Sequence, residues 1–320
     1  MHEMHSTIKY DYFIFIKSTA IMKLQKEKRK DAKEMKINTV TLNDGVEIPV
    51  SGFGTFQIPA DGSTYKAVKL ALEAGIRHID TAAAYFNEEE VGQTIKDSGI
   101  DRKELFITTK LWVQDNSYEA AKKALAISLK KLGLDYIDLY LMHQPYGDVQ
   151  GAWRAMEEAK AEGKVRSIGV CNMSPKIYQE NVPHFATKPS VNQIQFNPFN
   201  QQKPIREFMA KDGVHLEAWG PLGEGNKDLL TNPVITKLAK KYGKNTGQVI
   251  LRFELQEGAI IFPRSVKPAR IKSNMEIFDF ALTEEEMDEI RALDTGKGYD
   301  PDAPGLAERL ISAYDIHAND

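Results

Sequence analysis

Tyr136-Ile137-Asp138-Leu139-Tyr140-Leu141-Met142-His143 is a short, almost unbroken apolar run that ends on a polar residue. This composition is typical of a parallel strand that is buried on both faces. Seven similar runs lie at 52–56, 76–80, 105–110, 165–171, 190–195, 214–219 and 259–263. Amphipathic segments, in which apolar residues recur at helical spacing, lie between them at 63–74, 88–97, 117–132, 149–162, 204–212 and 233–242.

This alternation of strand and helix segments predicts an α/β chain folded as a (β/α)8 TIM barrel. Two shorter alternating segments, 37–42 and 46–50, flank Asn43-Asp44-Gly45 and predict an N-terminal β-hairpin that closes the bottom of the barrel. A doubly wound sheet is the alternative, but its G-x-G-x-x-G fingerprint is incomplete, because Gly52-Phe53-Gly54-Thr55-Phe56 has only two glycines. We therefore expect one barrel domain over residues 37–320.

Composition narrows the classes of function. The 320 residues include 42 Lys and Arg against 45 Asp and Glu, so there is no basic excess with which to bind nucleic acid. Cys171 is the only cysteine, which excludes a disulfide framework and a cysteine-based zinc cluster and favours the reducing cytoplasm. The sequence has neither a P-loop nor an H-E-x-x-H motif, and we expect no metal.

Residues 1–36 differ from the rest, with nine Lys and Arg against five acids. A basic stretch of this kind is typical of a disordered, solvated tail. The alternative is an upstream start codon, with Met22 or Met35 as the true first residue. The longest apolar run there, Tyr12–Ile16, is too short to span a bilayer, so we expect no membrane segment.

Chemistry in a barrel is found where the carboxyl ends of the strands meet. The residues that end or directly follow the predicted strands are Asp80, Lys110, His143, Asn172, Gln193, Trp219 and Arg264. Asp80 and Lys110 end adjacent strands, whose Cα atoms lie about 5 Å apart, so they can form an ion pair. Tyr85 follows Asp80 in the loop, and a neighbouring ammonium should lower its pKa into the range of a general acid or base. Together with His143, these residues predict a proton-transfer site.

Three stretches of the chain resemble the signatures of the aldo-keto reductase superfamily. The first is Gly75-Ile76-Arg77-His78-Ile79-Asp80-Thr81-Ala82, followed by Tyr85 and Asn87-Glu88-Glu89-Glu90; the second is Gly163-Lys164-Val165-Arg166-Ser167-Ile168-Gly169-Val170-Cys171-Asn172; the third is Phe262-Pro263-Arg264-Ser265, followed by Arg270 and Asn274. The resemblance extends from about residue 37 to residue 296. It is strongest to the bacterial group that includes the 2,5-diketogluconate reductases.

The resemblance implies an NADPH-dependent reduction of an aldehyde or ketone to the alcohol. Tyr85 would protonate the carbonyl oxygen, Lys110 held by Asp80 would lower the Tyr85 pKa, and His143 would orient the carbonyl group. NADP(H) would be bound by Cys171, Asn172, Gln193, Trp219, Gly220, Leu222, Arg264, Ser265, Arg270 and Asn274. Trp219 would stack on the nicotinamide, and the arginines would bind the 2′-phosphate, because guanidinium groups can hold a phosphate bidentately.

The chain departs from the family in the expected substrate pocket, which Phe56, His143 and Gln144 would line. Gln144 stands where the family often has tryptophan, so this wall would be polar and would favour a hydroxylated or charged substrate. Cys171 stands where serine is usual, and we favour a packing role for it. The segment 299–320 matches the family poorly, although such C-terminal loops usually shape substrate choice.

Other interpretations stay open from the sequence alone. Trp219 could be a core aromatic residue, and Asn172 and Gln193 could cap loops. A Schiff-base lyase would use Lys110 as its nucleophile, although Asp80 would keep that amine protonated. A non-catalytic nucleotide-binding subunit would keep the cofactor site without turnover. We expect a monomer whose partner is a small carbonyl compound.

Overall fold

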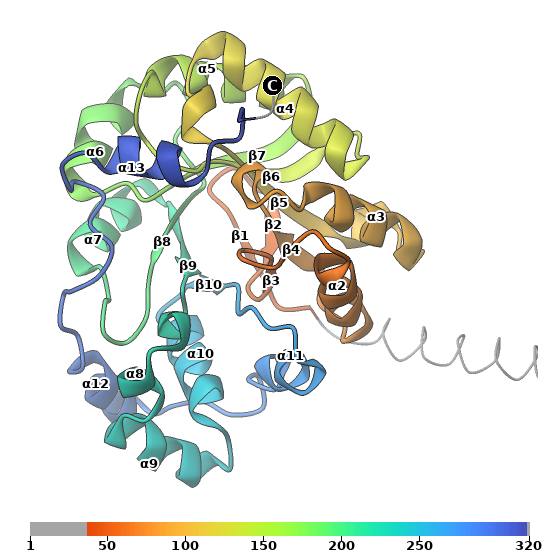
Figure 1. Ribbon diagram of the computed structural model, residues 1–320. Coiled ribbons are helices and arrows are strands. Elements are labelled where there is room, and N and C mark those ends of the chain that lie inside the picture. The colour runs from red at the N-terminus through yellow and green to blue at the C-terminus, as the bar shows by residue number, and fades with distance from the viewer. Residues whose placement is uncertain (1–36, 319–320) are drawn as a thin grey trace, which may run out of the picture. The chain divides into compact units, whose positions relative to one another are not determined.

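The computed structural model describes residues 37–318 (Figure 1). The chain divides into two units, Met1–Ile37 and Asn38–Asp320. The predicted basic tail, residues 1–36, lies outside the described residues and stays a prediction. Within residues 37–318, no helix combines the length and the apolar character needed to cross a membrane.

Eight parallel strands form the predicted barrel. In chain order they are β3 (Phe53–Gly54), β4 (His78–Asp80), β5 (Phe106–Leu111), β6 (Ile137–Met142), β7 (Val165–Cys171), β8 (Val191–Gln195), β9 (His215–Trp219) and β10 (Ile260–Ile261). Each strand pairs with its neighbours in the sequence. A parallel bridge between Ser51 and Ile261 joins the first strand to the last, with the Gly52 N–H donating to the Ile261 carbonyl oxygen at 2.9 Å. The predicted fold is therefore confirmed.

Helices surround the strands, as Figure 1 shows. They are α2 (Ser63–Glu73), α3 (Glu88–Ser98), α4 (Tyr118–Leu132), α5 (Val149–Ala161), α6 (Pro175–Asn181), α7 (Lys203–Asp212), α8 (Lys227–Leu230), α9 (Pro233–Tyr242), α10 (Thr246–Gln256), α11 (Pro268–Met275), α12 (Glu284–Arg291) and α13 (Leu306–Ala313). In β5 and β6 every residue is buried, because the barrel interior covers one face and the helices cover the other.

Helix α5 illustrates how the sequence determines these elements. Asp148 caps its first turn by accepting a hydrogen bond from the Gly151 N–H at 2.8 Å. A β-carbon at Gly151 would lie 2.1 Å from the Asp148 carboxylate, so glycine lets this carboxylate keep its capping position. Ala152, Trp153 and Met156 follow at helical spacing and are buried against the sheet.

The N-terminal hairpin, β1 (Thr39–Thr41) and β2 (Glu47–Pro49), closes the amino-terminal end of the barrel. Leu42 and Ile48 are buried in the cluster that fills the barrel interior. Asp44 accepts hydrogen bonds from Ser167, near the start of β7, at 2.8 Å and from Lys160 at 2.5 Å. The predicted closure of the bottom by the hairpin is confirmed, and the carboxyl ends of the strands stay open for a site.

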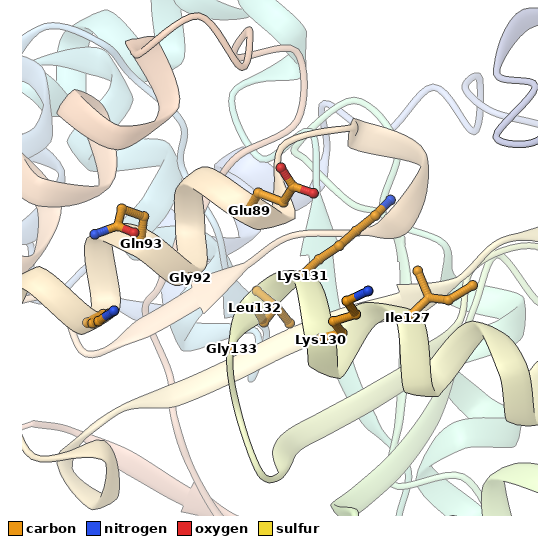
Figure 2. Close-up of a pocket in the computed structure, with 9 residues that line it drawn as sticks. Glu89, Gly92, Gln93, Ile127, Lys130, Lys131, Leu132 and Gly133 are labelled. Carbon is orange, nitrogen blue, oxygen red and sulfur yellow. The ribbon is translucent and has the colours of Figure 1, made fainter. Parts of the chain in front are cut away.

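Helices α3 and α4 cross closely on the outer face of the barrel. A β-carbon at Gly92 would lie 2.3 Å from the Leu132 carbonyl oxygen, so the crossing requires glycine. Figure 2 shows the shallow pocket beside this crossing, which Glu89, Lys130 and Lys131 help to line. Its lining residues all come from α3, α4 and the glycine that follows α4, and none of them is a predicted site residue.

Glu254 on α10 is a buried carboxyl group without compensation. It is fully buried, and neither carboxyl oxygen has a hydrogen-bond partner within residues 37–318. Burial raises the pKa of this group well above its ordinary value. Because the folded state holds the proton more tightly than the unfolded state, the cost to stability is absent at low pH. It grows as the pH rises above the unfolded-state pKa.

We therefore predict that Glu254→Leu stabilises the protein at alkaline pH. The free energy of unfolding at pH 8 should rise by about 1–3 kcal/mol, since a buried unpartnered polar group is removed. The gain should shrink at pH 5. Urea denaturation at both pH values measures this, with Glu73→Leu on exposed α2 surface as the matched control. A lower stability of Glu254→Leu at pH 8 would show that the carboxyl group has a stabilising role.

Candidate active site

Lys110 is at the centre of the residues that the strand ends bring together. It lies near the end of β5, and its side chain is completely buried. Its ammonium donates three hydrogen bonds, to Asp80 Oδ1 at 2.7 Å, to the Thr81 carbonyl oxygen at 2.9 Å and to the Tyr85 hydroxyl at 3.2 Å. Adjacent β4 and β5 supply the ion pair, and the short helix η1 (Ala83–Tyr85) after β4 carries the tyrosine. The predicted juxtaposition is therefore present.

Burial and charge act in opposite directions on the two titratable partners. Burial lowers the pKa of Lys110, but the Asp80 charge and the hydrogen bond to Asp80 raise it, so the net pKa lies above the ordinary value and the amine stays charged. Burial raises the pKa of Tyr85, and the Lys110 charge lowers it by less. The prediction that the Tyr85 pKa falls was wrong, because desolvation outweighs the ammonium. The phenol thus keeps its proton at neutral pH.

His143, directly after β6, completes this group as a neutral imidazole. Its ring lies edge-on to Tyr85, with 5.5 Å between ring centroids, and 5.0 Å from the ring of Trp112. Burial, followed by the Lys110 charge, lowers the pKa of His143 well below its ordinary value. Its Nδ1 atom is buried and has no partner among the described residues. His143 can therefore donate or accept a hydrogen bond, but it adds no positive charge to the site.

Asn172 and Trp219 are hydrogen-bonded to each other at the ends of β7 and β9. Asn172 Oδ1 accepts from Trp219 Nε1 at 2.8 Å, and Asn172 Nδ2 donates to the His143 carbonyl oxygen at 3.3 Å. Trp219 is half-buried, so it is not a core aromatic. Its ring lies edge-on to Tyr299, 5.4 Å away. The chain turns directly after Trp219, where Gly220 has a φ of 60°, and continues to Leu222.

Gln193 on β8 and Cys171 on β7 face the barrel interior. Gln193 Nε2 donates to Asp80 Oδ2 at 3.0 Å and to Glu217 Oε2 at 3.1 Å. Glu217 was missed by the sequence reasoning, although an acidic residue within the apolar run 214–219 was an available signal. Cys171 is buried, and burial raises the pKa of its thiol well above the ordinary value, which agrees with a packing role.

The predicted phosphate-binding residues gather around the start of α11. Arg264 follows β10 and is exposed, and its guanidinium contacts the Gln57 carbonyl oxygen at 3.4 Å. The Ser265 hydroxyl accepts from the Lys267 N–H at 3.1 Å. Arg270 is exposed in the first turn, no side chain caps the helix, and Asn274 is buried near its end. Cations and the positive end of a helix dipole together suit a phosphate group.

A series of aromatic contacts begins at the ring of Tyr85. Phe56 lies 4.9 Å from Tyr85 and 6.3 Å from Tyr314, which in turn lies 5.9 Å from Trp112, measured between ring centroids. Gln144 is buried, and its Oε1 accepts a hydrogen bond from the Tyr299 hydroxyl at 2.9 Å. The C-terminal segment thus reaches the site through two tyrosines. The sequence reasoning missed both tyrosines and Trp112, since their contacts are long-range.

Backbone strain marks the same end of the barrel. Five non-glycine residues within 37–318 have a positive φ, and all five lie between the end of a strand and the following α-helix: Gln57, Phe86, Asn172, Gln202 and Glu224. Each such conformation costs on the order of 1 kcal/mol for a residue with a side chain. Strain of this kind clusters at functional sites, where the surrounding structure holds it in place. The carboxyl end of the barrel is therefore the candidate site on two independent grounds.

Known proteins are similar to this chain over most of its length. A model of the aldo/keto reductase family matches residues 52–295. Glyoxal reductase of Bacillus subtilis (strain 168) is 46% identical over 268 residues, which cover 83% of this chain and 96% of that protein. Methylglyoxal reductase DkgA of Escherichia coli (strain K12) is 43% identical over 271 residues, or 83% and 98% of the two chains.

A solved structure extends the likeness to three dimensions. The crystal structure of a Bombyx mori aldo-keto reductase in complex with NADP is 36% identical and has a TM-score of 0.78, covering 85% of this chain and 96% of that one. The resemblance predicted from the three sequence signatures is confirmed. On the family match, the sequence identities and the barrel, this chain belongs to the aldo/keto reductase family.

Proposed function

We propose that this protein reduces a small aldehyde or ketone to the corresponding alcohol with NADPH. The observation that carries this proposal is the contact of 3.2 Å between the Tyr85 hydroxyl and the buried Lys110 ammonium, which is itself paired with Asp80 at 2.7 Å. This geometry supplies a protonated phenol beside a fixed positive charge, as a carbonyl reduction requires. The complex of the Bombyx mori relative with NADP supports the choice of cofactor.

When bound, NADPH would provide the hydride for the carbonyl carbon. Tyr85 donates its phenolic proton to the carbonyl oxygen, which becomes the alcohol oxygen. Lys110 is not a proton donor in this step. The positive charge of Lys110 stabilises the phenolate form of Tyr85 after the proton has been transferred. Asp80 keeps the ammonium in place through its hydrogen bond. His143, neutral and edge-on to Tyr85, orients the carbonyl group by a hydrogen bond.

The residues of the site fit a dinucleotide. Trp219 offers a half-buried ring on which the nicotinamide would stack. Asn172, Gln193 and the neighbouring Cys171 would hold the carboxamide, and Gly220 and Leu222 follow along the β9 loop. At the other end, Arg264, Ser265, Arg270 and Asn274 would hold the 2′-phosphate and the adenine. A flat platform with amide hydrogen bonds restrains the ring for hydride transfer.

We infer that the substrates are short carbonyl compounds such as 2-oxoaldehydes. Relatives named glyoxal reductase and methylglyoxal reductase support this inference. Phe56, His143 and Gln144 would contact the substrate, with Phe56 against the ring of Tyr85. The expected cytoplasmic location and monomeric state stay predictions.

The two alternative functions fit the site less well. A Schiff-base lyase needs a neutral amine, whereas Lys110 is buried with Asp80 and its pKa is raised. A non-catalytic nucleotide-binding subunit has no use for a protonated phenol held on an ammonium. Neither explains why the ion pair is placed beside Tyr85.

Tyr85→Phe tests the reaction. Loss of the phenolic proton should lower kcat for methylglyoxal by about 10²–10⁴-fold, because a general acid contributes about that much. NADPH affinity, followed by fluorescence titration, should change by less than about threefold. Tyr118→Phe on the outer helix α4 is the matched control and should keep full turnover. A Tyr85→Phe enzyme with wild-type kcat would exclude Tyr85 as the acid.

Arg264→Ala tests the cofactor assignment. Losing a charge-assisted contact to the 2′-phosphate should weaken NADPH binding by about 10- to 100-fold. NADH, which lacks that phosphate, should lose less than about threefold. Lys272→Ala, on the exposed end of the same helix α11, controls for the change in net charge. Equal losses for the two cofactors would contradict the assignment of Arg264.

A further inference from the structure

The side-chain amide of Gln193 is held between two acidic residues inside the barrel. Its Nε2 donates one hydrogen bond to Asp80 Oδ2 at 3.0 Å and another to Glu217 Oε2 at 3.1 Å. All three side chains are buried. Both N–H groups of the amide are therefore used, one by a residue of the ion pair and one by Glu217.

This arrangement determines which end of the amide faces inward. The Asp80 carboxylate only accepts hydrogen bonds. Glu217 Oε2 accepts one both when Glu217 is ionised and when its proton is on Oε1, so the two oxygens select the nitrogen of Gln193 and exclude its oxygen. Asp80 is held as an anion, because its other oxygen lies 2.7 Å from the Lys110 ammonium. No donor within residues 37–318 reaches Gln193 Oε1. That oxygen is left available to a ligand.

Glu217 contributes nothing else that would explain its burial. It is completely buried, and its Oε1 atom has no partner in the described part of the chain. It forms no ion pair there, and its register neighbours on β8 and β10 are Gln193 and Ile260. An apolar residue would fill this place in the barrel at lower cost. The hydrogen bond to Gln193 is the interaction that distinguishes glutamate from such a residue.

We propose that Glu217 is a positioning residue, which acts with Asp80 to hold the Gln193 amide so that its carbonyl oxygen faces the carboxamide of the cofactor. This rests on the proposed function, in which Gln193 contacts the nicotinamide. Glu217 itself does not touch the reacting atoms. It lies two residues before Trp219 on β9, so the same strand sets the amide and the aromatic platform.

The charge of Glu217 gives a second consequence. Burial, and then the charge of Asp80, raise the pKa of Glu217 to about 8. Lys110 lowers it by less, and the buried Cys171 thiol also faces the group. Above this pH the cluster of Asp80, Lys110 and Glu217 gains a negative charge next to the nicotinamide position. A negative charge there favours the cationic ring of the oxidised cofactor over the neutral ring of the reduced one.

Two substitutions separate the hydrogen bond from the charge. Glu217→Leu removes the acceptor, and we expect the Kd for NADPH, measured by fluorescence titration, to rise about tenfold. Glu217→Gln keeps an acceptor for Gln193, and we expect its Kd to stay within about threefold of wild type. Equal Kd values for the two variants would overturn the proposal. Thermal unfolding of both variants establishes that each is folded.

A double-mutant cycle tests that Glu217 acts through Gln193. Gln193→Leu alone should weaken NADPH binding, and adding Glu217→Leu to it should weaken binding by less than about twofold more. If Glu217→Leu costs its full tenfold in the Gln193→Leu background, the residue acts by some other route and the proposal fails.

The ratio of the Kd values for NADPH and NADP⁺ tests the charge. We expect this ratio to rise with pH across about 8 in the wild type and to stay flat in Glu217→Gln. Titration of the 2′-phosphate is common to both forms and cancels in the ratio. If the ratio of the two Kd values does not change with pH in the wild type, Glu217 is not the group that titrates. Absence of NADPH binding in the wild type would instead refute the proposed function, so the two failures are distinguishable.

Discussion

The buried ion pair between Lys110 and Asp80 is the constraint on which the site depends. A lone ammonium in the barrel interior would lose its proton, because burial lowers its pKa. The Asp80 charge at 2.7 Å reverses that shift, and the Thr81 carbonyl oxygen and the Tyr85 hydroxyl oxygen accept hydrogen bonds from the other two N–H groups of the ammonium. The charge is therefore permanent, and its direction is fixed by three acceptors from adjacent parts of the fold.

This fixed charge determines the state of the surrounding groups. His143 stays neutral, partly because Lys110 disfavours a second cation beside it. Tyr85 keeps its proton, since burial exceeds the effect of the ammonium, yet the ammonium remains in place to receive a phenolate. A proton donor needs both properties, a proton at neutral pH and stabilisation after the proton has left. Burial provides the first and Lys110 provides the second.

The strands and the polar residues at their carboxyl ends could be predicted from the sequence, because both follow from local pattern and topology. Parallel strands place their carboxyl ends together, so Asp80 and Lys110 had to meet once eight strands were recognised. The pKa of Tyr85 was predicted in the wrong direction, because desolvation depends on burial, which no local pattern records. Tyr299 and Tyr314 reach the site from a segment with no strand or barrel-helix pattern. Only tertiary contacts reveal them.

Buried polar groups lie at both ends of the barrel, and those at the carboxyl-terminal end bear on the function. At the amino-terminal end, the completely buried Asp138 binds Arg102 and Arg166, each at 2.6 Å, so its carboxylate is compensated. At the carboxyl-terminal end, His143 Nδ1 and Glu217 Oε1 have no partner within residues 37–318. Unsatisfied buried groups lower stability, so a fold retains them where another requirement outweighs that cost. At the carboxyl-terminal end that requirement is the site itself: His143 Nδ1 is held ready for a ligand, the proposed role of Glu217 is to hold the Gln193 amide, and the strained loop residues lie at the same end.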